Sequence, residues 1–123
     1  MQQFIFLSLC MLFSMSAMAQ NTNDRILGQW IDQDQTRVLE FVKNGSSYDA
    51  IIREAEPNSL IGKKQISSLK YDKGNAFKDG LLHVLQKGKT ATCSAKLLDD
   101  NKLQLKASKG LASKLSVWTR VTK

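Results

Sequence analysis

The chain has 123 residues, a formal net charge of +7 and a hydrophobic fraction of 42%, with two cysteines and one histidine. This length predicts no more than one domain, and the apolar fraction indicates a folded chain rather than a disordered one. A single histidine excludes a metal site built from several histidines and argues against a Ser-His-Asp hydrolase.

The first residues have the composition of an export signal. Residues 1–19 carry no charged side chain, and their apolar run over 4–13 is too short to span a bilayer. The small residues Ala17 and Ala19 fit a signal-peptidase site, whereas the alternative is a buried N-terminal helix. We therefore predict a cleaved signal peptide over 1–19, export to the periplasm or the extracellular space, and a single domain over 20–123.

The remaining chain alternates apolar and polar residues with a period of two, which is typical of strands. The sharpest turn signals are Asn44-Gly45, Lys87-Gly88 and Asp99-Asp100-Asn101. Short helical turns near 23–27 and Ser59 are the only helical alternatives that we leave open. We expect strands over 28–32, 36–43, 48–53, 61–71, 81–86, 90–98, 103–107 and 115–121.

Evenly spaced antiparallel strands in about 100 residues predict a meander that closes into a barrel or folds into a sandwich. The two ends resemble the closure of lipocalin-like barrels, in which an arginine of the last strand covers a tryptophan of the first. The alternative is a pair of ordinary core tryptophans. We expect an all-β, lipocalin-like (calycin-type) barrel of about eight strands. We assign its closure to Gly28, Trp30, Trp118 and Arg120.

The same ends resemble the domain-of-unknown-function family 2147, which comprises small exported bacterial proteins. The opening Asp24-Arg25-Ile26-Leu27-Gly28-Gln29-Trp30 and the closing Trp118-Thr119-Arg120-Val121 are similar to the ends of that family. Leu60-Ile61-Gly62 and Gly88-Lys89-Thr90 are similar to two shorter motifs between them. Asp49-Ala50-Ile51-Ile52 departs from the family pattern, so the chain resembles a divergent member. The resemblance implies an exported lipocalin-like barrel and supplies no catalytic residue.

The residues available for nucleophilic catalysis are His83 and Cys93, which lie on neighbouring predicted strands. A two-residue loop at Lys87-Gly88 would pair Leu82 with Cys93 and turn His83 outward, whereas a three-residue loop would place His83 opposite Cys93. We favour the first loop because it keeps Leu82 and Val84 on the core face. Cys93 is then a small core side chain, the chain has no internal disulfide after export, and we expect no enzyme.

Acidic residues cluster at two turns, one with Asp32 and Asp34 and one at Asp99-Asp100-Asn101. Neither has the spacing of a calcium loop, and turn aspartates that bond their own backbone explain both. The sequence contains no glycine-rich phosphate loop. We expect no metal and no cofactor.

The positive charge lies in the second half, because residues 20–60 carry −3 and residues 61–123 carry +10. The basic half is rich in lysine and has only Tyr71, Phe77 and Trp118 as aromatic residues, whereas nucleic-acid binders favour arginine and stacking aromatics. We therefore expect no nucleic-acid partner and interpret the lysines as a solvated surface. The alternative is contact with an anionic envelope polymer or lipid surface.

The predicted function is the binding of a small apolar molecule by a monomeric barrel without a transmembrane span. Small residues at Ala91, Cys93 and Ala95 leave room for a cavity, although large side chains on the facing strands are equally able to fill it. The candidate ligand-binding residues in the barrel interior are Tyr48, Ile52, Leu82, Val84, Cys93, Leu103 and Leu105.

Overall fold

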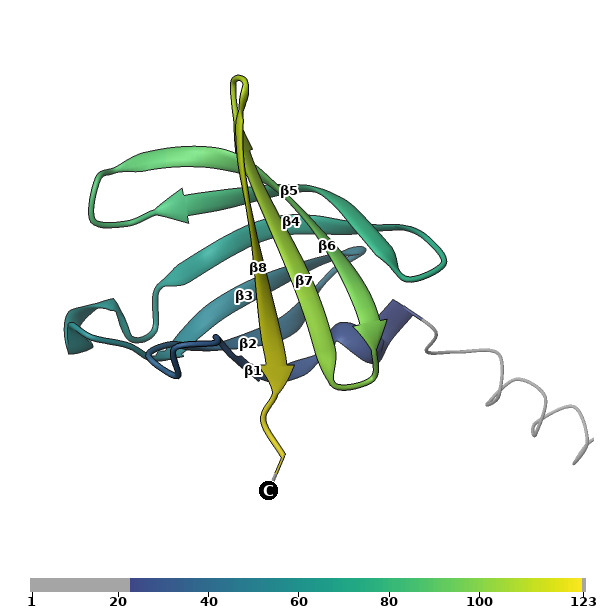
Figure 1. Ribbon diagram of the computed structural model, residues 1–123, viewed down its shortest axis with the longest axis horizontal. Helices are drawn as coiled ribbons and strands as arrows, with labels where there is room; N and C mark the ends of the chain where they lie inside the picture. The colour runs from purple at the N-terminus through teal and green to yellow at the C-terminus, as the bar shows by residue number, and fades with distance from the viewer. Residues whose placement is uncertain (1–22, 123) are drawn as a thin grey trace, which may run out of the picture.

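In the computed structural model, which describes residues 23–122, eight antiparallel strands follow one another around a closed barrel (Figure 1). Each strand pairs with its neighbour in the chain, and β1 closes on β8. The predicted barrel is therefore confirmed, and the sandwich alternative is wrong. The predicted signal peptide, residues 1–19, lies outside the described residues. The strands are β1 (Gly28–Ile31), β2 (Val38–Asn44), β3 (Ser47–Glu54), β4 (Lys64–Lys73), β5 (Ala76–Val84), β6 (Lys89–Asp99), β7 (Lys102–Lys109) and β8 (Ala112–Arg120).

The core is formed by the apolar residues that alternate along each strand. On β6, for example, Cys93, Ala95 and Leu97 are buried. Lys96 and Leu98, which alternate with these residues along the strand, are exposed. This alternation follows from the pleat of a strand, which turns successive side chains to opposite faces. Among residues 23–122 we find no helix with the length and apolar character needed to cross a membrane.

Strand β5 begins at Ala76, earlier than the predicted start at Leu81. The prediction failed because Lys78-Asp79-Gly80 resembles a turn, whereas the structure places an irregularity between Phe77 and Gly80 within the strand. A Cβ atom added at Gly80 would lie 2.9 Å from Leu69 Cδ1. The glycine therefore permits a close approach of β4 and β5.

The loop between β5 and β6 comprises residues 85–88, so the predicted two-residue loop is wrong. Cys93 lies opposite Gly80 rather than Leu82, and Leu82 lies opposite Ala91. Because this register differs from the predicted one by two residues, every side chain keeps its expected face. His83 accordingly lies outside the barrel, opposite Thr90.

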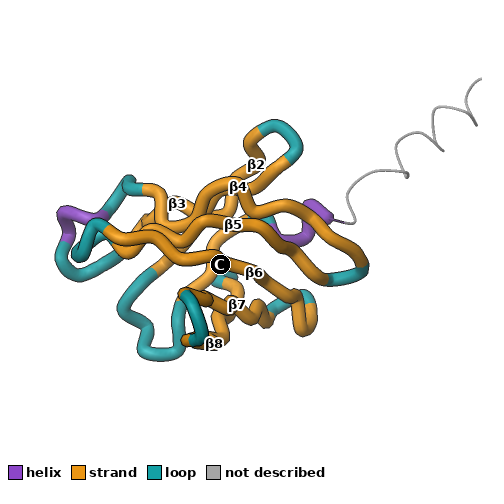
Figure 2. Tube along the Cα trace, turned by 90° about the horizontal axis from the view of Figure 1, so that it is seen from above, coloured by secondary structure: helices purple, strands orange, loops and turns teal. Residues whose placement is uncertain are grey.

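The two ends of the barrel are closed to different degrees. The 3-10 helix η1 (Asn23–Ile26) lies at one end, with the turns at 45–46, 74–75 and 100–101. The other end carries longer loops at 32–37 and 55–63, the second containing the 3-10 helix η2 (Asn58–Leu60). Figure 2 shows these loops and both short helices at the margins of the strands. We call the first the closed end and the second the open end.

Candidate functional site

Arg120 seals the closed end. Its guanidinium carbon lies 4.3 Å from the centre of the Trp30 ring. The Arg120 Nη1, Nη2 and Nε atoms donate to the backbone oxygens of Leu27, Arg25 and Asp100 over 2.9, 2.6 and 2.7 Å. The last strand is therefore tied to the first strand, to η1 and to the β6–β7 turn by one side chain.

The residues beneath Arg120 are shaped to receive it. Gly28 has a φ of +116°, and a Cβ atom there would lie 3.1 Å from Arg120 Nη1. The indole Nε1 of Trp30 donates to the backbone oxygen of Ile26 over 2.9 Å, and neither residue is exposed. Position 28 thus favours glycine for two reasons. Its φ is one that other residues rarely adopt, and the missing side chain leaves space for the Arg120 guanidinium. The assigned closure residues Gly28, Trp30 and Arg120 lie together here.

Tyr48 is also held at the closed end. Its hydroxyl donates to Asp24 Oδ1 over 2.7 Å, and Lys43 Nζ lies 3.1 Å from the same oxygen. The hydrogen bond from Tyr48, followed by the bond from Lys43, lowers the pKa of Asp24. Burial, followed by the neighbouring Asp24, raises the pKa of Tyr48. Tyr48 packs edge-on against Phe77, so it is part of the packed core.

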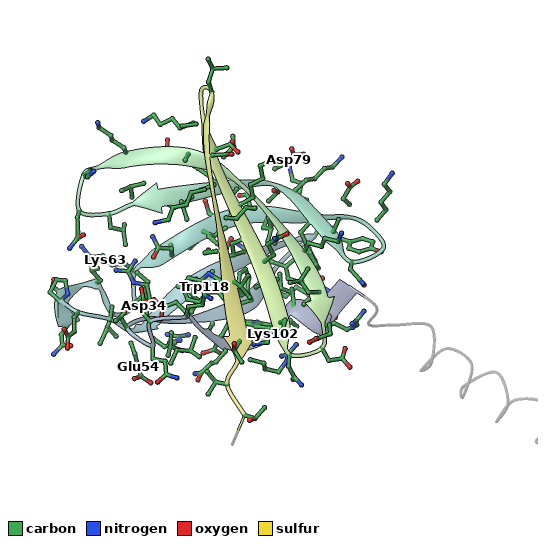
Figure 3. The ribbon with its side chains drawn as sticks, in the orientation of Figure 1. Asp34, Glu54, Lys63, Asp79, Lys102 and Trp118 are labelled. Atoms are coloured by element: carbon green, nitrogen blue, oxygen red, sulfur yellow. The ribbon has the colours of Figure 1, made fainter. Side chains whose placement is uncertain are left out.

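The open end contains a cavity of about 390 Å³. Inward-facing apolar side chains form its floor, and polar side chains from the loops and from β4 and β8 form its rim. In the view of Figure 3, the rim residue Asp34 lies toward the side of the long loops, and Trp118 lies farther toward the strands. The floor includes Leu39, Ile66, Leu82, Cys93, Leu105 and Trp118, and the rim includes Asp32, Gln33, Asp34, Arg37, Gln65, Lys114 and Ser116.

Three of the seven predicted interior residues, Leu82, Cys93 and Leu105, line this cavity. Val84 lines only a smaller adjoining cavity of about 170 Å³, together with Leu82. We also predicted that Tyr48, Ile52 and Leu103 would contact a ligand, but these residues do not line either cavity. All three are at most 1% exposed, because the core packs over them.

Trp118 has a different position from the one that we assigned. We placed it with the closure residues, but it lines the cavity at the open side of the core. Its indole Nε1 donates to Ser116 Oγ over 3.0 Å, and the residue is 8% exposed. The ring therefore gives the cavity a broad apolar wall, and its polar nitrogen already has a hydrogen-bond partner.

The rim has two polar groups that the sequence analysis did not identify. Arg37 Nη1 donates to Gln65 Oε1 over 2.6 Å, and Gln65 Nε2 donates to the His83 backbone oxygen over 2.6 Å. Arg37 precedes β2, and Gln65 lies at the start of β4. Arg37 and Gln65 are 28 residues apart in the sequence and meet only in the folded barrel, so no sequence motif identifies them as a pair.

Asp32 organises the loop that carries Arg37. Its carboxylate accepts hydrogen bonds from the Thr36 N–H and hydroxyl, both over 2.8 Å, and from the Arg37 N–H over 3.1 Å. Burial alone would raise the pKa of Asp32, but these hydrogen bonds outweigh it and hold that pKa below its usual range. The prediction that turn aspartates bond their own backbone is confirmed at this turn.

Cys93 and His83 do not form a catalytic pair. His83 Nε2 lies 3.0 Å from Ser67 Oγ on the outer face, whereas Cys93 is buried inside the barrel. Burial raises the pKa of the Cys93 thiol to about 11, so the thiol is protonated near neutral pH. Within the described range 23–122, no three His, Cys, Asp or Glu side chains gather in a way that would hold a metal ion.

Comparison with known proteins places the chain in a sequence family and a fold. The family described as "Uncharacterized protein conserved in bacteria (DUF2147)" matches residues 28–120. No curated protein matches the chain. The solved structure of HP1028 from Helicobacter pylori, described as belonging to the lipocalin family, matches with a TM-score of 0.66 at 16% identity over 79% of this chain and 83% of that chain. The match shows a shared lipocalin-like barrel fold.

Proposed function

The chain belongs to the DUF2147 family of bacterial proteins, and on that premise we propose that it is an exported, non-enzymatic barrel that binds one small, mainly apolar molecule. The observation that carries the proposal is the open-end cavity of about 390 Å³. This volume falls in the lower part of the range of about 300–1,000 Å³ that is common for small-molecule sites. The signal-like residues 1–19 support export.

The chemistry of the cavity favours binding over catalysis. Leu82, Leu105 and Trp118 form an apolar surface, and burial of such a surface against a ligand contributes about 25 cal/mol per Å² before the costs of association. Cys93 is a thiol with a raised pKa, and no histidine lies beside it. An apolar floor with polar groups at its rim is the usual composition of a small-molecule site.

The proposal is tested by native mass spectrometry of gently purified protein. We expect a bound small molecule on the wild type and its loss from Ala107→Phe, because Ala107 lines the cavity and a larger side chain there fills it. Leu98→Phe is the matched control, because Leu98 is 48% exposed on the outer face. Wild-type protein that carries no molecule and takes up none from a panel of apolar compounds would overturn the proposal.

A second candidate function is contact with an anionic lipid surface, and the β7–β8 hairpin favours it. The hairpin projects beyond the other loops (Figure 1). Leu111 at its tip is fully exposed, and Lys109 and Lys114 flank it on exposed positions. An apolar tip between lysines matches a bilayer surface with negative head groups, where each basic residue contributes about 1 kcal/mol.

Sedimentation with vesicles tests this second function. We expect binding to vesicles that contain anionic lipid, weakened by salt and by Leu111→Ser or the pair Lys109→Gln and Lys114→Gln. Leu98→Ser and Lys96→Gln are the controls, since both residues are exposed on β6 away from this hairpin. Equal sedimentation of all variants would exclude the hairpin as the contact.

A further inference from the structure

Arg37 is a charged residue of the cavity without an anionic partner. Within residues 23–122, no carboxylate lies within ion-pair distance of its guanidinium, whose one hydrogen bond goes to Gln65. Arg25 and Arg53 each pair with a carboxylate, and Arg120 binds three carbonyl oxygens. Arg37 therefore keeps unused N–H donors beside the cavity, since a guanidinium has five.

The acidic residues at the rim form no ion pair with Arg37 within the described range 23–122. Asp32 is adjacent in the loop and stays ionised, but its oxygens accept from the Thr36 N–H and hydroxyl and from the Arg37 backbone N–H rather than from the Arg37 guanidinium. Asp34 is exposed at the rim (Figure 3), and no ion pair joins it to Arg37. Lys114 adds a second positive charge to the rim. The guanidinium of Arg37 thus keeps N–H donors for a ligand.

Gln65 holds Arg37 in place. Gln65 is only 8% exposed, and its Nε2 donates to the His83 backbone oxygen. Because this bond fixes the side-chain amide, its Oε1 faces Arg37 Nη1 at 2.6 Å. Arg37 lines both the main cavity and the smaller adjoining one. The buried amide therefore holds one edge of the guanidinium in a fixed orientation beside the cavity.

We propose that the ligand of this cavity is a carboxylic acid with a short or medium apolar chain, whose carboxylate Arg37 binds. The chain would lie on the floor formed by Leu82, Leu105 and Trp118. Arginine suits this task because its planar donors match the two oxygens of a carboxylate. This inference rests on the proposed function and adds the class of ligand to it.

The test compares decanoate with decanol, which has the same chain but no charge, by calorimetry on the full chain below micelle-forming concentrations. We expect the wild type to bind decanoate more tightly. Arg37→Met should weaken decanoate binding about ten- to a hundred-fold, as expected for a lost charge-assisted hydrogen bond, and should change decanol binding far less. Arg53→Met is the control, because it removes the same charge from the outer face.

Gln65→Glu provides an independent variant that keeps the side-chain size and places a carboxylate next to Arg37. We expect Gln65→Glu to weaken decanoate binding much more than decanol binding. This variant tests the inference even if Arg37→Met does not fold. Equal affinity of the wild type for both probes, or unchanged decanoate binding in both variants, would overturn the inference and leave the proposed function standing. Absence of decanoate binding also overturns the inference, and only the additional absence of any other bound molecule contradicts the proposed function.

Discussion

The guanidinium carbon of Arg120 lies 4.3 Å from the centre of the Trp30 ring and joins the last strand to the first. The ladder between these strands is short, because only Trp30–Arg120 and Ile31–Thr119 are paired across it. Arg120 adds three hydrogen bonds to backbone oxygens at the same place. Closure of the barrel therefore depends on this side chain as well as on strand pairing.

Arg120→Ala should lower the free energy of unfolding by about 2–4 kcal/mol, since it removes the contact with Trp30 and several charge-assisted hydrogen bonds. Arg53→Ala removes a partly exposed ion pair with Glu40 and should cost less than about 1 kcal/mol. Urea unfolding followed by circular dichroism measures both. Equal losses in the two variants would contradict a special role of Arg120 in closure.

Gly80→Ala should destabilise the barrel by about 1–3 kcal/mol through overpacking. The new methyl group would meet Leu69 Cδ1 at 2.9 Å and the Cys93 backbone oxygen at 3.1 Å. In the double variant with Leu69→Ala, the loss should be smaller than the sum of the single losses, because the leucine no longer competes for the space. Thermal unfolding of the four proteins gives this coupling, and strict additivity would argue against the contact.

The stability of the fold should fall in acid partly through Asp49, which is 3% exposed. Burial alone would raise its pKa, but hydrogen bonds from the Ser68 N–H, Asn44 and Lys64 outweigh burial and lower that pKa. A carboxyl group with a lowered folded-state pKa stabilises the fold above its unfolded pKa of about 3.9, and this contribution is lost as the pH falls through the folded pKa.

Asp49→Asn should therefore be less stable than the wild type near pH 7, and the difference should shrink as the pH falls below about 4. Asparagine keeps an acceptor for the Ser68 N–H, but its amide nitrogen replaces the oxygen that faces Asn44 Nδ2 and Lys64 Nζ, so the change removes the charge and both of those interactions. Urea unfolding between pH 3 and pH 7 measures the difference. A difference that stays constant over this range would contradict the assignment.

Alkylation of Cys93 by iodoacetamide at neutral pH should be much slower in the folded protein than in the urea-unfolded chain. The thiol is buried, and burial raises its pKa to about 11, so little thiolate is present. Peptide mapping by mass spectrometry follows this residue separately from Cys10. Fast labelling of Cys93 in the folded protein would contradict its position in the structure.

Much of the fold could be predicted from the period of two in the sequence. Thr92 to Leu97 alternate so clearly that the faces of β6 followed from the sequence alone. The start of β5 was missed because Asp79 and Gly80 favour turns, yet here they form an irregular strand whose glycine is required by its neighbours. Strand faces depend on local alternation, whereas this irregularity depends on contacts between strands.

Less of the site could be predicted. Leu82, Cys93 and Leu105 were identified as interior residues and do line the cavity. The alternation predicts which residues face inward, but it does not tell residues that line a cavity from residues in a packed core. That distinction depends on the position of each residue along the barrel axis. Arg37 and Gln65 were missed because they come from separate segments that meet only at the open end of the folded barrel.

The most direct test of the central claim uses the indole N–H signals of the two tryptophans in a nuclear magnetic resonance titration with decanol. Trp118 lines the cavity, and Trp30 is 0% exposed beneath Arg120 at the closed end. If the barrel binds a small apolar molecule in its open-end cavity, the Trp118 signal shifts saturably while the Trp30 signal stays in place. Equal shifts of both signals, or no shift of Trp118 with decanol or with any other compound of the apolar panel, would contradict the account.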